Sequence, residues 1–417
     1  MLSPKLLIIG SVWPEPNSSA AGSRMMQLIA AFHKANYQIT FASAAADSEF
    51  SVDLASIGVN KVHIQLNSAS FDTFVAQLNP QVVIFDRFMT EEQYGWRLRE
   101  SCPEALQILD TEDLHCLRAA RQNAWKAGKA FQISDLLTEE VAKREIASIL
   151  RCDLSLVISA FELDLLQNLF KIEPSLLLYL PFMLEQLPAD FAEKIPSFEH
   201  RKHFISIGNF LHQPNWQSVL HLKNKIWPLI RKRLPQAEIH IYGAYPSEKV
   251  FQLQQPKEGF IIKGRAENVN AVMQNARVCL APLLFGAGLK GKLIDAMQNG
   301  TPNVTTAIGA EAMHGNLAWP GRIENDVEKF ADAAVALYQN KDLWMQKQAL
   351  AYPIINQIYS KTAGERALLN NIGKLLSTLQ QHRQQNFLGA MLRHHQLNST
   401  KYLSKWIEAK NKTQRLD

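Results

Sequence analysis

Short apolar runs separated by amphipathic stretches recur along the first half of the chain and predict alternating strands and helices. Residues 6–10, a continuous apolar run, have the character of a strand covered on both faces. Further strands are predicted over residues 38–42, 61–64, 82–86, 106–110 and 154–159. Between the first two runs, Met26, Leu28, Ile29 and Phe32 recur at helical spacing. This alternation indicates a parallel α/β sheet, whose binding sites lie at the carboxyl ends of the strands.

A second series of alternating elements begins at residue 204. Predicted strands start there and continue over residues 238–243, 260–264 and 278–282, with a helix over residues 215–231. The preceding residues, 184–203, are polar, contain prolines and have no periodicity, as expected for a linker. We therefore expect a first domain over residues 1–195, a second over residues 204–365 and a helical basic tail over residues 366–417.

A glycine-containing loop between residues 278–282 and a helical pattern over residues 289–299 is the most informative stretch. Backbone N–H groups and the positive end of a helix dipole attract phosphate oxygens at such a position. Lys290 and Lys292 add two cations to the first turn, where a helix normally favours carboxylates, and Asp295 lies one turn further along. The pattern suits a diphosphate with a ribose beyond it. An ordinary strand–loop–helix unit with solvated lysines remains the alternative from spacing alone.

The same stretch resembles the donor site of glycosyltransferase family 4 (glycosyl transferases group 1), whose members have the GT-B fold. The resemblance is carried by FGAGLKGKLIDA at residues 285–296, GTP at residues 300–302 and GAE at residues 309–311. It implies donor-binding roles for Lys290, Lys292 and Asp295, and also for Glu311. Two positions depart from the family pattern, because Asp295 replaces a glutamate and Ala287 stands where a partner glutamate is usual.

Two further stretches resemble glycine-containing turns of the family. The segment GNFLHQPN at residues 208–215 is similar to the opening of its second domain, which implies that Gly208 and Asn209 lie beside the nucleotide phosphates. In the loop after the first strand, Gly22 matches a glycine that approaches the donor diphosphate or the acceptor. Arg24 beside it could reach a phosphate or be an ordinary surface arginine.

Polar side chains follow the predicted strand 106–110, and we expect them to shape the acceptor site. The segment DTEDLHCLR at residues 110–118 resembles a DxxDLHxLR stretch found in some family members. Asp113 and His115 are the candidate catalytic residues on this side, although a simple helix N-cap is an alternative reading. Ser159 and Glu162 resemble an SxxE motif, for which we expect a capping box.

Composition narrows the class of protein further. No apolar stretch in the 417 residues approaches the roughly 18 needed to span a membrane, and the first residues lack the flank and core of a signal peptide. The four cysteines show no metal-ligand spacing, so we expect free thiols and a cytoplasmic location. The net charge of +5 comes from residues 381–417, which contain seven Lys or Arg and two Asp or Glu. Residues 1–380 contain 37 basic and 37 acidic residues and have no net charge. A nucleic-acid-binding protein would carry a basic stripe on its folded domains, so this class is excluded.

The basic tail has two interpretations. Apolar residues recur there at helical spacing among basic residues: Phe387, Leu388, Met391, Leu392, Tyr402, Leu403, Trp406 and Ile407 among Arg383, Arg393, Lys401, Lys405, Lys410, Lys412 and Arg415. An amphipathic basic helix suits peripheral contact with the inner face of an anionic membrane, where a lipid-linked acceptor would be found. Alternatively the apolar faces pack on the protein itself.

The expected architecture is therefore α/β, with two Rossmann-like GT-B domains facing a cleft. The resemblance implies transfer of a sugar from a nucleotide-sugar donor to a hydroxyl of a sugar, lipid-linked or protein acceptor, with retention of configuration. Neither a metal nor another cofactor is expected, because Lys290, Lys292 and the helix N-terminus can neutralise the leaving diphosphate. A sugar-nucleotide epimerase and a non-catalytic GT-B scaffold are the alternatives.

Overall fold

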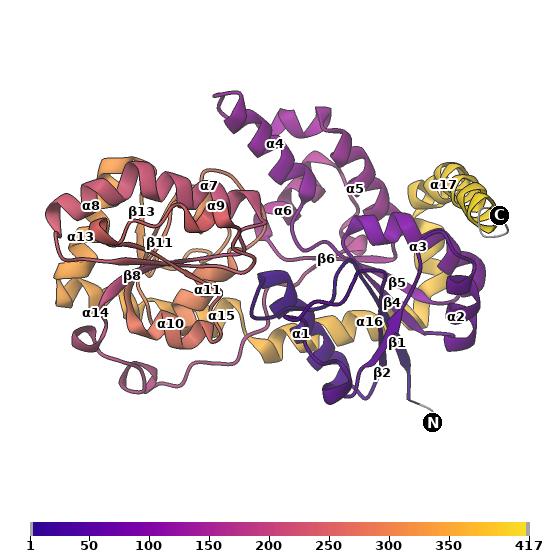
Figure 1. Ribbon diagram of the computed structural model, residues 1–417. Helices are drawn as coiled ribbons and strands as arrows, with labels where there is room; N and C mark the ends of the chain where they lie inside the picture. The colour runs from indigo at the N-terminus through magenta and orange to yellow at the C-terminus, as the bar shows by residue number, and fades with distance from the viewer. Residues whose placement is uncertain (1–2, 414–417) are drawn as a thin grey trace.

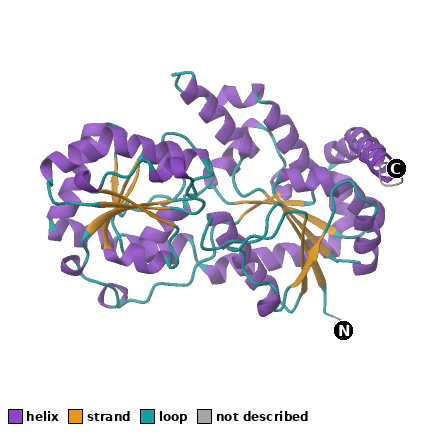
Figure 2. Cartoon of the chain, in the orientation of Figure 1, coloured by secondary structure: helices purple, strands orange, loops and turns teal. Residues whose placement is uncertain are grey.

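The computed structural model describes residues 3–413, with the side chains of residues 395–398 and 412–413 outside the description. The chain folds into two α/β lobes that lie side by side, each with helices on both faces of a central sheet (Figures 1 and 2). The basic residues Lys412 and Arg415 fall outside the described side chains. Among the described helices, none combines the length and apolar character needed to cross a membrane.

The first lobe is built on a parallel sheet with the strand order β3-β2-β1-β4-β5-β6-β7. Its strands are β1 (Lys5–Gly10), β2 (Gln38–Ser43), β3 (Asn60–His63), β4 (Val82–Asp86), β5 (Leu106–Asp110), β6 (Leu154–Val157) and β7 (Leu177–Tyr179). Its helices are α1 (Ala20–Lys34), α2 (Ser70–Leu78), α3 (Phe88–Ser101), α4 (His115–Lys126), α5 (Glu140–Arg151) and α6 (Ala160–Asp164), the last continued by a π-helical turn, Leu165–Leu169.

The second lobe repeats this design with the strand order β10-β9-β8-β11-β12-β13. Its strands are β8 (His203–Ile207), β9 (Ile239–Tyr242), β10 (Phe260–Gly264), β11 (Ala276–Ala281), β12 (Asn303–Thr305) and β13 (Gly321–Ile323). Its helices are α7 (Gln213–His221), α8 (Trp227–Arg233), α9 (Glu248–Phe251), α10 (Val269–Asn275), α11 (Gly291–Gln298), α12 (Ala307–Ala310), α13 (Val327–Gln339), α14 (Lys341–Ala349) and α15 (Ala351–Ile358).

Strand pleating explains why the central strand of the first lobe is apolar along most of its length. Leu7 and Ile9 of β1 pack into the core on one face of the sheet, with Phe71 and Leu98 from α2 and α3. Leu6 and Ile8 pack into the core on the opposite face, beneath α1. Since both faces are covered by helices, most positions of such a strand are apolar, and the polar exceptions Gln107 and Asp110 of β5 are hydrogen-bonded to arginines.

The predicted α/β GT-B architecture of two Rossmann-like domains is confirmed, and the differences are local. The short strands β7 and β13 were missed, and the single helix predicted over residues 215–231 is divided into α7, a π-helical turn and α8. The expected linker over residues 184–203 carries two 3₁₀ turns, Phe191–Glu193 and Phe198–His200. The domain boundary expected at residue 365 falls inside helix α16 (Lys361–Gln385).

Helix α16 returns the chain from the second lobe to the first and runs beneath the first-lobe sheet (Figure 1). Leu368, Ile372, Leu375 and Leu379 recur at helical spacing and are buried in the same core as α1. This part of the predicted tail is therefore integral to the first domain.

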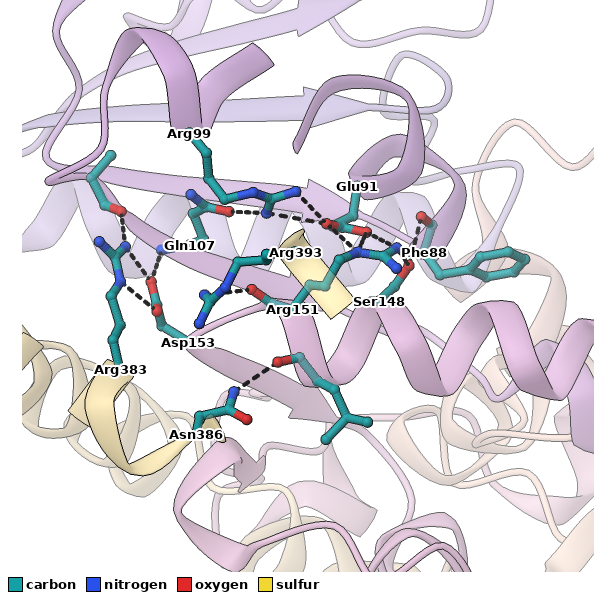
Figure 3. Close-up of polar contacts among 12 residues, drawn as sticks. Phe88, Glu91, Arg99, Gln107, Ser148, Arg151, Asp153, Arg383, Asn386 and Arg393 are labelled. Atoms are coloured by element: carbon teal, nitrogen blue, oxygen red, sulfur yellow. Dashed lines mark hydrogen bonds and ion pairs between the residues drawn. The ribbon is translucent and has the colours of Figure 1, made fainter. Parts of the chain in front are cut away.

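Helix α17 (Phe387–Thr413) packs on α5 and α3 largely through polar groups. At the junction that precedes it, the Arg383 guanidinium forms an ion pair with the Asp153 carboxylate, 2.8 Å apart, and Asn386 donates to the carbonyl of Leu150 (Figure 3). Arg393 donates to the carbonyl of Arg151 in the same region (Figure 3). Further along, the Ser404 hydroxyl accepts from Arg97.

Large apolar side chains of α17 consequently face solvent. Phe387, Tyr402 and Trp406 are more than 60% exposed, and Leu388, Met391 and Leu403 are exposed as well. The tail thus packs on the protein, as one interpretation expected, but it does so mostly with its polar residues.

Replacing Ile372 by Ala tests whether α16 belongs to the first-domain core. Ile372 is buried and Leu376, one turn further along α16, is 37% exposed. We expect Ile372→Ala to lower the free energy of unfolding by about 2–5 kcal/mol and Leu376→Ala by less than about 1 kcal/mol. Urea denaturation measures both, and equal losses would contradict the packing of α16 described above.

Candidate active site

A cleft of about 810 Å³ lies between the two lobes, at the carboxyl ends of strands from both sheets. This is where parallel α/β sheets place ligands. Its lining from the first lobe includes Pro16–Ala21, Arg87, Glu112, Asp113, His115 and Arg118, and from the second lobe Gly208, Asn209, His212, Asn215, the loop 285–292 and Asp295.

The glycine loop before α11 lies directly against the first lobe. Gly288 adopts the left-handed conformation (φ 62°), and a Cβ there would approach the Asp113 Cβ to 2.8 Å. A Cβ on Gly291 would meet Ala20 at 2.6 Å. The pattern of glycines therefore serves two needs at once, a backbone turn and close contact between the lobes.

The two lysines of this loop are held by neutral oxygens. Lys292 Nζ donates to Asn215 Oδ1 over 2.9 Å, and Lys290 Nζ donates to the Gly288 carbonyl over 2.6 Å. Burial lowers the pKa of each lysine to about 8, although Glu311 opposes the shift at Lys290. Lys290 is buried and Lys292 is partly buried, and neither ammonium group contacts a carboxylate among the described residues. The two lysines therefore form a site prepared for an anion.

The turn after β8 supports Lys292. A Cβ on Gly208 would lie 2.7 Å from Asn215 Cγ and 2.9 Å from Lys292 Nζ, so a larger residue would displace both side chains. Asn209 closes the turn, because its Oδ1 accepts from the Leu211 N–H and its carbonyl accepts from Asn215. Gly208 and Asn209 therefore lie in the cleft beside Lys292, where the sequence analysis expected them.

Asp295 lies in the cleft one turn beyond the lysines. Burial raises the pKa of its carboxyl group to about 7, and nearby Lys292 opposes this shift. Within the described part of the chain, its carboxylate has no hydrogen-bond partner. This acceptor is accordingly available to a ligand hydroxyl.

The candidate acceptor residues line the facing wall of the cleft. The Asp113 carboxylate is 3.1 Å from Arg118 Nε and 3.6 Å from His115 Nε2. Burial lowers the pKa of His115 to about 4, despite Asp113, so the imidazole is neutral at pH 7. Arg118 also contacts His212 of the second lobe across 3.2 Å. The structure thus brings Asp113 and His115 together within the cleft and leaves His115 outside the core.

Glu162 connects the two lobes, a role the sequence analysis missed. Its Oε1 accepts from the Gly288 N–H of the second lobe over 2.7 Å and from the Leu114 N–H over 3.2 Å. The expected capping box with Ser159 is wrong, since Ser159 makes no side-chain cap. Burial, reinforced by Asp113, raises the pKa of the Glu162 carboxyl to about 8.

A second connection corrects the expectation for Glu311. Its carboxylate forms a bidentate ion pair with Arg121 of α4, at 2.8 and 2.7 Å, and it does not line the cleft. Arg121 also donates to the Gly286 carbonyl over 2.8 Å. Glu311 thus fastens the glycine loop to the first lobe and leaves no carboxylate oxygen unpaired for the donor.

The expectations for Gly22 and Arg24 are also corrected. Gly22 lies in the first turn of α1 against the backbone of Glu15, where a Cβ would come within 2.4 Å, and it does not line the cleft. Arg24 is fully buried and forms an ion pair with Asp110 across 2.8 Å, while also donating to the Leu180 carbonyl. Both residues therefore make their contacts within the first lobe and are not placed to contact a ligand in the cleft.

Solved structures with this architecture are GT-B glycosyltransferases. Sucrose-phosphate synthase from Thermosynechococcus elongatus superposes with a TM-score of 0.68 at 14% identity, covering 90% of this chain and 100% of that one. Anabaena HepE in complex with UDP and glucose superposes with a TM-score of 0.64 at 12% identity, and the alignment covers 89% of this chain and 100% of HepE. Staphylococcus aureus TarM, in a complex that includes UDP, superposes with a TM-score of 0.55 at 15% identity, and the alignment covers 72% of this chain and 58% of TarM. The protein therefore has the GT-B fold.

The second lobe matches a family model. Residues 201–340 match the family described as glycosyl transferases group 1. An uncharacterised 44.6 kDa protein in the cps region of Klebsiella pneumoniae is 28% identical over 148 residues. That alignment covers 34% of this chain and 38% of the Klebsiella protein, so it spans well under half of the relative's length.

The two lysines predict a pH-dependent affinity for a nucleoside diphosphate. Bound phosphate favours the charged form of Lys290 and Lys292, so binding requires a proton wherever the free lysine has lost one. Affinity for UDP should hence fall as pH rises through 8, by roughly fivefold between pH 8 and pH 9 for each lysine that contacts it. Isothermal titration calorimetry across pH 7–9 measures this.

Lys292→Gln should weaken UDP binding at pH 7 by about 1–3 kcal/mol and flatten its pH dependence. Lys329→Gln on the exposed first turn of α13 is the matched control and should leave both unchanged. If the Lys292→Gln variant binds UDP with wild-type affinity at every pH, Lys292 does not contact the nucleotide.

Proposed function

We propose that this protein is a glycosyltransferase that moves a sugar from a nucleotide-sugar donor to a hydroxyl acceptor. The observation that carries the proposal is the pair of lysines at the start of α11, one buried and one partly buried, which line one cleft with the polar wall of the first lobe. The family match over residues 201–340 includes both lysines. Anabaena HepE, similar in fold, has been crystallised with UDP and glucose, which supports a donor of this class.

In the proposed reaction the bond between the anomeric carbon and the diphosphate oxygen breaks, and a bond to the acceptor oxygen forms. Negative charge develops on the departing diphosphate, where Lys290, Lys292 and the N-terminus of α11 stabilise it. These groups supply the charge neutralisation for which other enzymes use a metal ion, so we propose a metal-independent transfer. Retention of configuration is the outcome that the family resemblance implies.

The remaining groups position the two substrates. We propose that Asp295 accepts hydrogen bonds from the ribose hydroxyls, because its carboxylate lies one turn beyond the lysines. Gly208 and Asn209 provide the turn beside the phosphates. On the acceptor side, we propose that neutral His115 accepts the proton of the incoming hydroxyl during transfer, and that the Asp113 carboxylate stabilises the imidazolium that forms.

The cellular setting is part of the same proposal. The relative in the Klebsiella cps region supports a role in cell-surface polysaccharide or glycoconjugate synthesis. All four cysteines are buried free thiols, which suits the reducing cytoplasm.

Measuring nucleotide release from several donors, with and without acceptors, tests the function. UDP-glucose, UDP-N-acetylglucosamine and GDP-mannose are each incubated with a panel of methyl glycosides. We expect an acceptor to increase release from at least one donor at least about tenfold, as transfer replaces slow hydrolysis. His115→Ala should reduce this stimulated rate while leaving UDP affinity within about twofold.

Two outcomes would replace the proposal. Conversion of the donor sugar into its epimer, with no acceptor present, would identify an epimerase. Tight UDP binding with neither release nor epimer formation would identify a non-catalytic scaffold, for which Ala287 provides the sequence basis.

We further propose that α17 contacts an anionic membrane surface peripherally. Its exposed aromatic residues Tyr402 and Trp406 lie among Lys405 and Lys410, the combination that favours binding at a lipid headgroup interface. Tyr402→Ser with Trp406→Ser should abolish sedimentation with phosphatidylglycerol vesicles without changing the melting temperature. Unchanged sedimentation, or equal sedimentation of the wild type with neutral phosphatidylcholine vesicles, would contradict this proposal.

A further inference from the structure

Two non-glycine residues of the first lobe hold unfavourable backbone conformations at the cleft. Arg87, directly after β4, has φ 71° and ψ 159°, a region that is nearly restricted to glycine. Glu112, two residues after β5, has φ 60°. Both line the cleft, and β4 and β5 are neighbours in the sheet. Such strain concentrates at sites that bind ligands.

The Glu112 carboxyl group is buried without a partner. The side chain is about 9% exposed, Oε1 is sealed from solvent, and no hydrogen bond to either oxygen is found within residues 3–413. Arg24, a buried cation that acts on Glu112 electrostatically, is already paired with Asp110. An unsatisfied buried carboxyl costs stability, so its retention on a cleft wall points to a ligand that donates a hydrogen bond.

Arg87 supplies the complementary groups. Its Nη1 donates to Ser11 Oγ over 2.5 Å, and Ser11 in turn donates to Asp86 through both its hydroxyl and its backbone N–H. The guanidinium is thereby anchored, while its other nitrogens make no hydrogen bond with described residues. It therefore retains N–H groups that can donate to a ligand oxygen.

We propose that Glu112 and Arg87 bind neighbouring hydroxyls of a neutral sugar acceptor, with the carboxyl group accepting from one hydroxyl and the guanidinium donating to another. The inference rests on the proposed function and assigns the acceptor class. Burial raises the pKa of the Glu112 carboxyl group well above its ordinary value, which favours its neutral form, and Asp86 lies 3.7 Å from the Arg87 guanidinium and balances its charge. The two side chains therefore suit a ligand without charge. Polyols satisfy both side chains because each hydroxyl both donates and accepts.

Glu112→Gln and Glu112→Asn test the proposal, and Asn suits the left-handed backbone of this position. The exposed Glu140→Gln on α5 is the matched control. Binding of methyl glycosides of glucose, galactose, mannose and N-acetylglucosamine is followed by saturation-transfer NMR, with and without UDP. UDP affinity and the melting temperature are measured separately on every variant.

We expect the wild type and Glu140→Gln to bind at least one glycoside, and both Glu112 variants to bind it at least about tenfold more weakly. Their UDP affinity should stay within twofold of the wild type. Their melting temperature should be equal or higher, since an unpaired buried carboxyl group is removed. A merely structural Glu112 would instead lower the melting temperature when replaced.

Several results would overturn the inference. Equal glycoside binding by wild type and Glu112 variants would remove Glu112 from the acceptor site. Failure of every glycoside to bind the wild type, or preferential binding of glucose 1-phosphate, would reject a neutral acceptor. A wild-type protein that does not bind UDP would instead refute the proposed function. The glycoside titrations without UDP would in that case still decide whether Glu112 binds the acceptor.

Discussion

The glycine loop of the second lobe is fastened to the first lobe, and the cleft depends on this attachment. Glu162 accepts hydrogen bonds from the backbone of Gly288 and of Leu114, and Arg121 joins Glu311 and the Gly286 carbonyl. Hydrogen bonds to charged groups, as between Arg121 and Glu311, contribute about 1.5–3 kcal/mol each. Those to the Glu162 carboxyl group, whose pKa burial raises to about 8, contribute about 0.5–1.5 kcal/mol each. They hold the start of α11 against the start of α4, so the lysines face Asp113 and His115 across a short gap.

The charged residues that line the cleft differ from those in the protein core. A charged side chain buried in the core is normally paired with an opposite charge, as Arg24 is with Asp110. Lys290, Lys292 and Asp295 instead have their pKa values shifted by burial toward the neutral form and contact no opposite charge. A nucleoside diphosphate would supply both the anion that the lysines lack and the hydroxyls that Asp295 lacks.

Sequence patterns predicted the parts of this arrangement that are local. Apolar runs identified most strands, whereas β7 and β13 span three residues each and are too short for a periodic signal. The spacing of Gly208, Lys290, Lys292 and Asp295 placed all four in the cleft. Glu162 and Glu311 were misread because their partners in the other lobe, Gly288 and Arg121, lie more than a hundred residues away in the chain.

Other features depend on geometry that a sequence does not encode locally. The positive φ values of Arg87 and Glu112 have no local sequence signal, although both residues follow predicted strands, at the sheet edge where sites were expected. The amphipathic pattern of α17 indicated a helix but not which face would dock. Its docking face was decided by the polar surface of α3 and α5, including Arg97 and the carbonyls of residues 150 and 151.

A crystal structure of the protein with UDP tests the central claim most directly, because it shows which groups the attached loop presents to the diphosphate. The account predicts phosphate oxygens within hydrogen-bonding distance of Lys290 or Lys292 Nζ and of backbone N–H groups at the start of α11. It also predicts a ribose hydroxyl on Asp295, with the Glu162–Gly288 contact intact. A diphosphate bound elsewhere in the cleft, with both lysines still on their protein oxygens, would contradict it.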